Sequence, residues 1–324
     1  MNYKKSEQLL DRALKSIPLA SQTFSKSLTQ YPRGVSPFFI EKGKGSRVWD
    51  VDGNEYIDFV NSLAAVTLGY CDKNVDEAVQ KQMQNGVTFS LPHCLEMEVA
   101  EKLIDIIPCA EKVRFAKNGT DATSASIRIA RAYTGKDHIA VCGYHGWQDW
   151  YIGSTTRDLG VPKAVKELTH KFEYNNIESL EKIFQERELA CVIMEPMNAE
   201  YPQDNFLEKI KTLAHKNDAL LIFDETITGF RYSLGGAQAL FNVIPDLATF
   251  GKGMANGYPL SAVVGSNEIM QKVEDIFFSG TFGGETLSLA AANAVIDKYK
   301  KDNVPKYLND LGNYLLKKLN QLII

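Results

Sequence analysis

Short, continuous apolar runs that alternate with helical patterns are the strongest constraint on the fold of this chain. Such runs occupy residues 138–142, 190–194 and 219–224, and shorter ones lie at about 247–250 and 260–264. Strands that are apolar on both faces are typical of a parallel sheet covered by helices on its two sides. The sequence therefore predicts an α/β fold with a mainly parallel sheet flanked by helices.

Helical patterns fill the segments around these runs. We expect helices at residues 74–85, 95–107, 120–133 and 204–217, and a further short strand at 113–117. The first three helices run up to a glycine or a proline, residues that commonly end helices. This order of elements supports one continuous α/β region.

The two ends of the chain have a different pattern. Residues 6–17 form an amphipathic helix that we expect Pro18 to stop, and residues 47–60 alternate around a central Asp-Gly in the manner of a β-hairpin. A final helix is expected at about 303–324. The start of the chain therefore has the pattern of an arm outside the α/β region.

Composition excludes several classes of function. The net charge of −4 gives no general attraction to nucleic acid or to an anionic membrane. No apolar run approaches the roughly 20 residues that span a bilayer. Five widely spaced cysteines without a Cys-x-x-Cys pair favour reduced thiols in a cytoplasmic protein, and the scattered histidines predict no metal site.

Two charged residues at the ends of neighbouring strands are the first candidates for chemistry. Asp224 closes an apolar strand, where a carboxylate costs several kcal/mol unless a cation pairs with it. That cation is either a protonated heterocycle or an arginine such as Arg231; the alternative is that Asp224 caps a local turn. Lys252 follows between two glycines, where the backbone can approach a ligand closely, although a surface lysine fits the same pattern. No Walker A pattern surrounds it.

Other strand ends carry groups suited to a flat, phosphorylated ligand. Residues 118–121 open a helix with Asn-Gly-Thr-Asp, which suits either an anion site or an ordinary helix cap. Tyr144 can stack on a flat ring or belong to the core, and residues 281–285 form a glycine-rich turn. Ligands bind at the carboxyl ends of such strands, where Glu195 also lies.

In this order the segments resemble one family, the class III pyridoxal-phosphate (PLP) aminotransferases of fold type I, and within it the branch of glutamate-1-semialdehyde 2,1-aminomutase. The resemblance covers about residues 31–320. The segments that carry it are Val48-Trp-Asp-Val-Asp-Gly-Asn-Glu-Tyr-Ile-Asp58, Lys117-Asn-Gly-Thr-Asp-Ala122 with Arg128-Ile-Ala-Arg131, Gly143-Tyr-His-Gly146, Phe223-Asp-Glu-Thr-Ile-Thr-Gly-Phe-Arg231 and Pro245-Asp-Leu-Ala-Thr-Phe-Gly-Lys252.

The resemblance implies a role for each candidate residue. Lys252 is expected to bond covalently to PLP, and Asp224 to pair with the ring nitrogen of PLP and keep it protonated. Matching positions imply further cofactor-binding residues: Gly119 and Thr120 at the phosphate, Tyr144 and Thr226 on the two faces of the ring, and His145 and Glu195 close to the cofactor.

Thr281 matches a threonine that reaches the phosphate in the neighbouring subunit. It therefore implies a homodimer with shared active sites. The resemblance also implies that residues 1–60 are an N-terminal arm and hairpin and that residues 61–290 are the large PLP-binding domain. Residues 291–324 are then the start of a truncated C-terminal lobe.

The implied activity is transfer of an amino group by a lysine-mediated 1,3-proton shift, as in the aminomutase. Two departures leave the substrate open: the segment after Arg33 is short, and Gly283-Gly-Glu285 replaces the Gly-Gly-Asn common in the class. The alternatives are an aminotransferase for another oxo substrate, such as a keto-sugar, and a non-catalytic PLP-binding module. A Rossmann dehydrogenase is excluded because no predicted strand leads into Gly-x-Gly-x-x-Gly.

Overall fold

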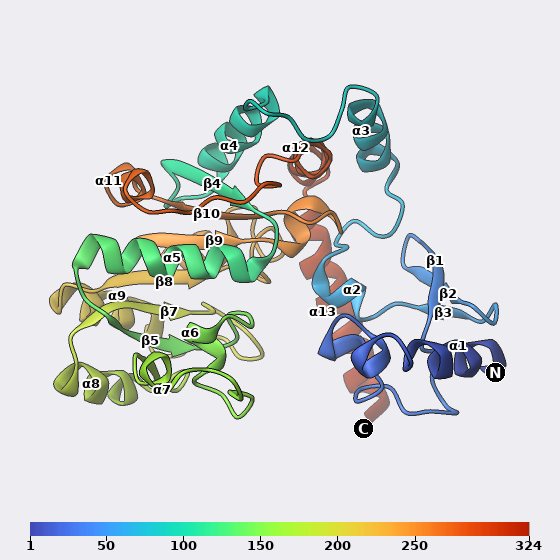
Figure 1. The fold of residues 1–324 in the computed structure, drawn as a ribbon, viewed down its shortest axis with the longest axis horizontal. Helices are drawn as coiled ribbons and strands as arrows, with labels where there is room; N and C mark the ends of the chain where they lie inside the picture. The colour runs from blue at the N-terminus through green and yellow to red at the C-terminus, as the bar shows by residue number, and fades with distance from the viewer. Residues whose placement is uncertain (324) are drawn as a thin grey trace.

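A seven-stranded sheet forms the centre of the computed structural model, which describes residues 1–323 (Figure 1). Its order is β4-β10-β9-β8-β7-β5-β6. The strands are β4 (Lys112–Ala116), β5 (His138–Cys142), β6 (Thr169–Lys171), β7 (Leu189–Met194), β8 (Leu220–Asp224), β9 (Leu247–Phe250) and β10 (Ser261–Gly265). Only β10 runs antiparallel to its neighbours, so the predicted mainly parallel sheet is confirmed.

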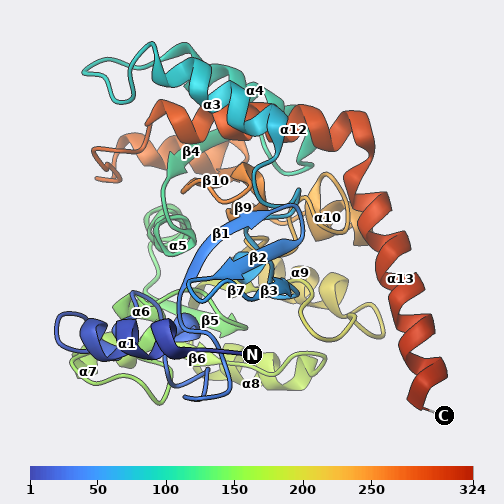
Figure 2. The same cartoon turned by 90° about the vertical axis from the view of Figure 1, so that its right-hand side faces the viewer.

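Helices cover both faces of this sheet. They include α3 (Lys73–Met83), α4 (Cys94–Ile106), α5 (Gly119–Thr134), α8 (Ile177–Glu186), α9 (Phe206–Lys216), α10 (Gly236–Phe241), α11 (Asn267–Met270) and α12 (Thr286–Asp302). Figure 2 shows α5 on one side of the strands and α9 and α10 on the other. Within this α/β region, the helices and strands predicted from the sequence match the observed ones within two residues, whereas β6, α8, α10 and α11 were missed.

Strand β8 shows how the apolar runs build the core. Leu220 and Ile222 pack with α5 residues such as Ile127, while Leu221 and Phe223 pack on the opposite face with the helices there. Successive side chains of a strand point to opposite faces, so a continuous apolar run is buried on both sides. The carboxylate at the end of this run, Asp224, is therefore carried by a strand that is buried on both faces.

The N-terminal region lies apart from the large sheet (Figure 1). It contains α1 (Lys4–Ala13) and an antiparallel sheet of β1 (Ile40–Lys44), β2 (Arg47–Asp50) and β3 (Glu55–Ile57). The predicted hairpin is confirmed as β2 and β3, but β1 was missed.

The predicted end of the first helix was wrong by four residues. The helix stops at Ala13, and Ile17 is extended, with φ −131° and ψ 120°. A residue that precedes a proline is disfavoured in helical conformation, and Ile17 precedes Pro18.

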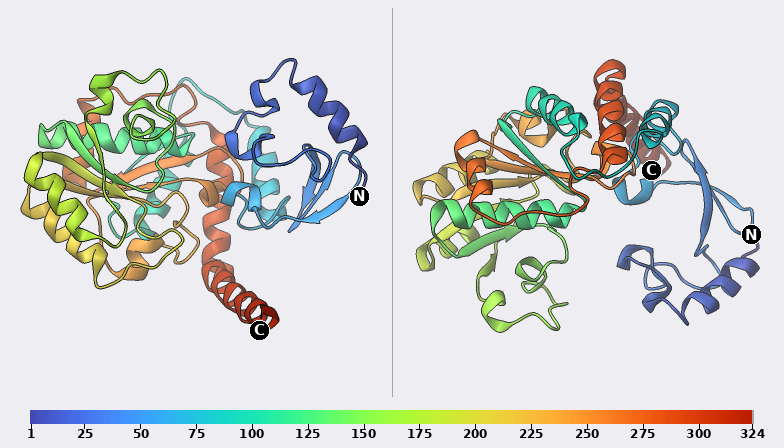
Figure 3. Two further views of the ribbon diagram at one scale, coloured as in Figure 1. Left: turned by 90° about the horizontal axis from the view of Figure 1, so that it is seen from below. Right: turned by 45° about the horizontal axis from the view of Figure 1, so that its top comes forward.

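A long helix, α13 (Val304–Ile323), follows α12 after Asn303, which has a left-handed φ of 47°. Figure 3 shows α13, in red, projecting from the rest of the molecule. The predicted end of this helix at residue 324 lies outside the described residues. No helix within residues 1–323 is long and apolar enough to cross a membrane. The five cysteines are free thiols, three of them buried.

Candidate active site

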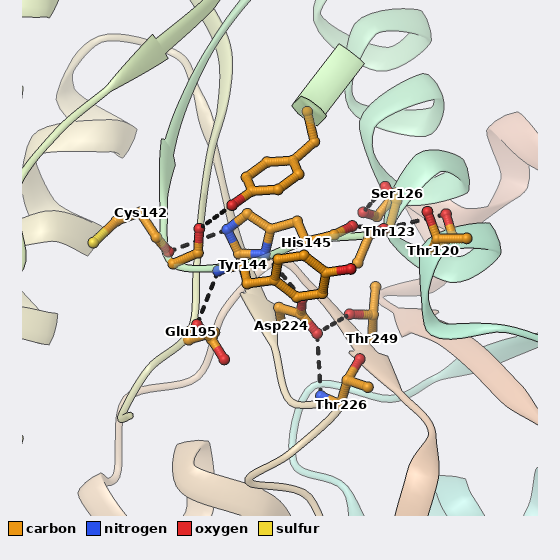
Figure 4. A network of polar contacts seen from close by, with 12 residues as sticks. Thr120, Thr123, Ser126, Cys142, Tyr144, His145, Glu195, Asp224, Thr226 and Thr249 are labelled. Atoms are coloured by element: carbon orange, nitrogen blue, oxygen red, sulfur yellow. Dashed lines mark hydrogen bonds and ion pairs between the residues drawn. The ribbon is translucent and has the colours of Figure 1, made fainter. Parts of the chain in front are cut away.

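The carboxyl ends of the strands bring the candidate residues into one cluster (Figure 4). The side chain of Thr226 packs against both Gly119 and Gly251: a Cβ placed on either glycine would lie 3.1 or 3.4 Å from Thr226 Cγ2. The start of α5, the end of β8 and the residue before Lys252 therefore meet around one threonine. A side chain larger than glycine at position 119 would crowd this contact.

Asp224 is the buried carboxylate of the cluster. Its Oδ2 lies 2.9 Å from His145 Nδ1, and its Oδ1 accepts hydrogen bonds from Thr249 Oγ1 at 3.0 Å and from the Thr226 N–H at 3.1 Å. Burial alone would raise the pKa of Asp224, but hydrogen bonding to His145 and its charge prevail, so the pKa lies below its usual value. The carboxylate is ionised, and Arg231 is not its partner.

His145 lies directly behind Asp224 and is fully buried. Its second ring nitrogen, Nε2, lies 3.1 Å from the carbonyl oxygen of Cys142. A carbonyl oxygen only accepts hydrogen bonds, and so does an ionised carboxylate. Both ring nitrogens of His145 therefore carry protons, and the ring is a cation that holds the Asp224 carboxylate in place.

Lys252 begins the short 3₁₀ helix η3 (Lys252–Ala255) with a left-handed φ of 43°. Such a conformation is uncommon for a residue with a side chain and is concentrated at functional sites. Burial lowers the pKa of Lys252; the charges of Asp224 and Glu195 oppose this, while that of Arg231 adds to it. The net shift is downward, so this amine gives up its proton more readily than a free lysine.

The start of α5 offers groups for an anion. The carboxylate of Asp121 accepts the Asn118 N–H at 2.8 Å, which fixes the first turn, while the N–H groups of Gly119 and Thr120 have no intrahelical partners. Such free N–H groups at the positive end of a helix favour a phosphate.

Two buried hydroxyls near this turn also lack partners. Of the buried side-chain oxygens and nitrogens in the described chain, three make no hydrogen bond, and two of these are Thr120 Oγ1 and Thr226 Oγ1. Buried polar atoms are rarely left unsatisfied, so two at one place point to a ligand. Gly146 closes over Thr120: its φ is 109°, and a Cβ there would lie 2.2 Å from Thr120 Oγ1.

Tyr144 provides an open aromatic face beside Asp224. Its side chain is 61% exposed, and its backbone N–H donates to Glu195 Oε2 at 2.9 Å. Burial and the neighbouring Asp224 charge raise the pKa of Glu195. Tyr151 meets the ring of Tyr144 edge-on and donates to the Gly143 carbonyl at 2.8 Å, so Tyr144 is held from one side and open on the other.

These groups fit PLP. The molecule has a ring nitrogen for a buried carboxylate, an aldehyde for an amine, a flat face for an aromatic ring, and a phosphate for a helix start with free hydroxyls. The structure brings eight of the nine predicted site residues to this cluster: Gly119, Thr120, Tyr144, His145, Glu195, Asp224, Thr226 and Lys252.

Thr281 is the exception. It is exposed and lines an open cavity of about 790 Å³ together with Lys117 and Asp121 beside the start of α5. Neither Asp224 nor Lys252 lines this cavity. Thr281 therefore lies outside the cluster formed by the other eight residues of the same chain.

Sequence reasoning missed two polar residues of the site region. Thr249 lies opposite Asp224 in the register of β8 and β9, and a hydroxyl within an apolar strand was a signal for it. Glu225 is fully buried and accepts the N–H groups of Ala237 at 2.7 Å and Gln238 at 2.9 Å. Burial raises its pKa. Nothing in the local sequence separates its role from that of Asp224.

Comparison with known proteins identifies the family. A family model described as aminotransferase class-III matches residues 30–323. The chain is 40% identical over 314 residues to the 3-aminobutyryl-CoA aminotransferase of Cloacimonas acidaminovorans, covering 94% of this chain and 75% of that protein. It is 38% identical over 345 residues to the glutamate-1-semialdehyde 2,1-aminomutase of Francisella philomiragia, covering 99% and 78%.

Solved structures agree with this assignment. The PLP-bound FumI protein of Sphingopyxis sp. MTA144 superposes with a TM-score of 0.87 at 29% identity, covering 92% of this chain and 73% of that one. An omega-transaminase from Sphaerobacter thermophilus gives a TM-score of 0.83 at 30% identity, covering 91% and 72%. The resemblance inferred from the sequence is confirmed: this chain belongs to the class III aminotransferases, PLP-dependent enzymes of fold type I.

Proposed function

We propose that Lys252 and Asp224 carry the amino-group transfer of this enzyme and that its substrate is a small amino or oxo acid of the kind used by glutamate-1-semialdehyde 2,1-aminomutase. One observation carries the proposal. An ionised, buried Asp224, held by the cationic ring of His145, shares a cluster with a lysine whose pKa is lowered. Burying a charged pair seldom adds to the stability of a fold, so this arrangement indicates that Asp224 binds a ligand.

When bound, PLP supplies an aldehyde that condenses with amines and a ring that accepts electrons. Asp224 would hold a proton at the ring nitrogen of bound PLP, and its bonds to His145 and Thr249 fix the position of the carboxylate. With PLP bound, Lys252 Nζ would take a proton from the substrate carbon that bears the nitrogen and return it to the carbon on the other side of that nitrogen, which is the 1,3-shift of transamination. Its lowered pKa makes it a base at a lower pH than an ordinary lysine.

An arginine close to Lys252 favours a substrate that carries a carboxylate. Arg33 is unsuited to bind it, because its guanidinium is paired with Glu7 and Asp11 beside α1. Arg231 instead donates to two neutral carbonyls, those of Ile227 at 3.1 Å and Ala64 at 2.8 Å, and its charge reaches Lys252. No salt bridge involves Arg231 within the described residues. We therefore assign Arg231 to the substrate carboxylate.

An aminotransferase for a different oxo substrate is the second candidate. It is favoured by the 40% identity to the 3-aminobutyryl-CoA aminotransferase and by the Gly283-Gly-Glu285 departure. A keto-sugar is one such oxo substrate and is included in the substrate assay. A non-catalytic PLP-binding module is disfavoured, since Asp224 and Tyr144 lie in the cluster and Lys252 interacts with the charge of Asp224.

A substrate assay separates these candidates. We expect the purified protein, loaded with the amino form of the cofactor, to convert glutamate-1-semialdehyde to 5-aminolevulinate without an added amino donor. If it fails to do so but transfers an amino group from glutamate to another oxo compound, the aminomutase assignment is wrong. Absence of any transfer would support the non-catalytic module.

We also propose a cytoplasmic homodimer with shared active sites. The free thiols support a reducing compartment, and the placement of Thr281 outside its own cluster supports a role in the partner's site. Sedimentation of the holoenzyme tests the dimer. Mixed dimers of Thr281→Ala and Lys252→Ala subunits test the sharing: under it, both defects fall in the same active site, so about half of the sites retain full function.

A further inference from the structure

An ion pair joins two segments that flank the start of α5. Lys117 is the residue before Asn118, and Glu285 is the N-cap residue of α12. Lys117 Nζ lies 3.0 Å from Glu285 Oε2, and the two side chains are only 17% and 13% exposed. Most ion pairs of this chain are more exposed, so water and salt screen this one less than the others.

Glu285 is anchored to α12 independently of Lys117. Its carboxylate accepts hydrogen bonds from the Leu287 N–H at 2.6 Å, the Ser288 N–H at 3.2 Å and Ser288 Oγ at 2.7 Å. Burial would raise its pKa, but the bonds to Ser288 and Lys117 prevail and lower it. Glu285 is therefore a fixed negative charge at the first turn of a buried helix.

Lys117 is anchored to α5 on the other side. Its backbone N–H and that of Asn118 both point to Asp121 Oδ2, at 3.3 and 2.8 Å. The backbone of Lys117 is thus part of the turn that presents the N–H groups of Gly119 and Thr120. The Lys117–Glu285 pair consequently ties this turn to α12, which is packed into the core through Leu289, Ala292 and Val295.

We propose that Glu285 and Lys117 are positioning residues that set the affinity of the enzyme for the phosphate of its cofactor. Asparagine, common in the class at this position, would still cap α12 but would leave Lys117 without its counter-charge. Glu285 both caps α12 and pairs with Lys117. The proposal rests on the proposed function only in placing the phosphate at the start of α5.

The test compares cofactor binding with and without the phosphate. Wild-type, Glu285→Asn, Lys117→Met and doubly substituted proteins are stripped of cofactor and titrated with PLP and, separately, with pyridoxal, which lacks the phosphate. We expect each single substitution to weaken PLP binding about tenfold and the double substitution to add little, since the residues act as a pair. Binding of pyridoxal should stay unchanged.

Lys102→Met is the matched control. It removes another lysine that pairs with an aspartate of α12, Asp297, but lies on α4, away from the phosphate turn. This variant should bind PLP like the wild type. Glu285→Gln replaces Glu285→Asn if the latter does not fold, because it removes the charge while keeping the length of the side chain.

Several results would overturn the proposal. Unchanged PLP affinity in Glu285→Asn and Lys117→Met, even with a lower melting temperature, would make the pair merely structural. Tighter PLP binding in Glu285→Asn would show that Lys117 is a direct phosphate ligand that Glu285 competes for. Equal weakening of PLP and pyridoxal would exclude a phosphate-specific role. If wild-type protein binds no PLP, the proposed function itself fails, which is a separate result.

Discussion

Asp224 and Glu225 are adjacent, buried carboxylates at the end of β8, yet their pKa values shift in opposite directions. Asp224 faces a cationic ring, that of His145, and its pKa is lowered. Glu225 is bonded to neutral donors, namely the hydroxyl of Thr228 and the N–H groups of α10, and burial raises its pKa.

We propose that this difference separates a catalytic carboxylate from a structural one. A charged partner keeps Asp224 ionised where a ligand needs a negative charge, while Glu225 fixes the loop between β8 and α10 from behind. Burial alone therefore does not mark a catalytic carboxylate; the charge of its partner does. The same distinction separates Glu285, held near a cation, from an ordinary helix cap.

The largest effect is expected from Lys252→Ala. Without the amine, no base remains to move the proton, so the rate of amino transfer should fall at least about a thousandfold. The melting temperature of the cofactor-free protein should not fall, because the charge of Lys252 is poorly solvated there. Steady-state kinetics and calorimetry measure the two quantities. Transfer within tenfold of the wild type would exclude Lys252 as the base.

Asp224→Asn should follow, with a loss in kcat of about a hundredfold or more, since one buried charge aimed at the reacting system is removed. Glu225→Gln is its paired control and should change kcat by far less. If the two variants lose activity equally, the two carboxylates do not divide catalysis and architecture as proposed.

Glu225→Ala should chiefly destabilise the fold. It leaves the buried N–H groups of Ala237 and Gln238 without an acceptor, which we expect to cost about 2–3 kcal/mol in the free energy of unfolding. Urea denaturation of the cofactor-free protein measures this. A loss below about 0.5 kcal/mol would show that water replaces the carboxylate and that the loop is not fixed by it.

The pH dependence of stability should distinguish the same pair. Because the pKa of Asp224 is lowered on folding, its ionisation stabilises the fold above its unfolded-state pKa, near 3.9. This contribution to stability is lost as the pH falls through its folded-state pKa. The pKa of Glu225 is raised on folding, so its effect on stability has the opposite pH dependence. Its contribution to stability is present below its unfolded-state pKa, near 4.3, and is lost as the pH rises through its folded-state pKa.

Melting temperatures of cofactor-free protein across this pH range check these signs. Asp224→Asn should flatten the loss of stability in acid, and Glu225→Gln should reduce the loss as pH rises. His145→Gln keeps a donor for Asp224 but removes the charge, so it should shift the acid loss to higher pH. An acid limb that is identical in His145→Gln and wild type would contradict a cationic His145.

The sequence predicted most of the sheet because its strands are apolar on both faces, a pattern that local composition reveals. It also placed the candidate residues correctly at strand ends, since parallel strands finish at one edge. The role of His145 behind Asp224 was not predictable, because it depends on where the turn after β5 directs the side chain. The Lys117–Glu285 pair joins residues far apart in the chain, and the short strand β6 has only three residues.

The division into an N-terminal arm, a large domain and the start of a C-terminal lobe stays a prediction. The separate three-stranded sheet of β1–β3 is compatible with an arm that meets another part of an assembly.

Borohydride trapping of the PLP-loaded protein directly tests whether Lys252 is the lysine that bonds covalently to PLP. Reduction fixes the cofactor on the lysine to which it is covalently linked, and mass spectrometry of the digested protein then locates it. We expect one pyridoxyl group per chain, on Lys252, and no trapping in Lys252→Ala. A pyridoxyl group on another lysine, or unchanged trapping in Lys252→Ala, would show that Lys252 is not the lysine that bonds to PLP.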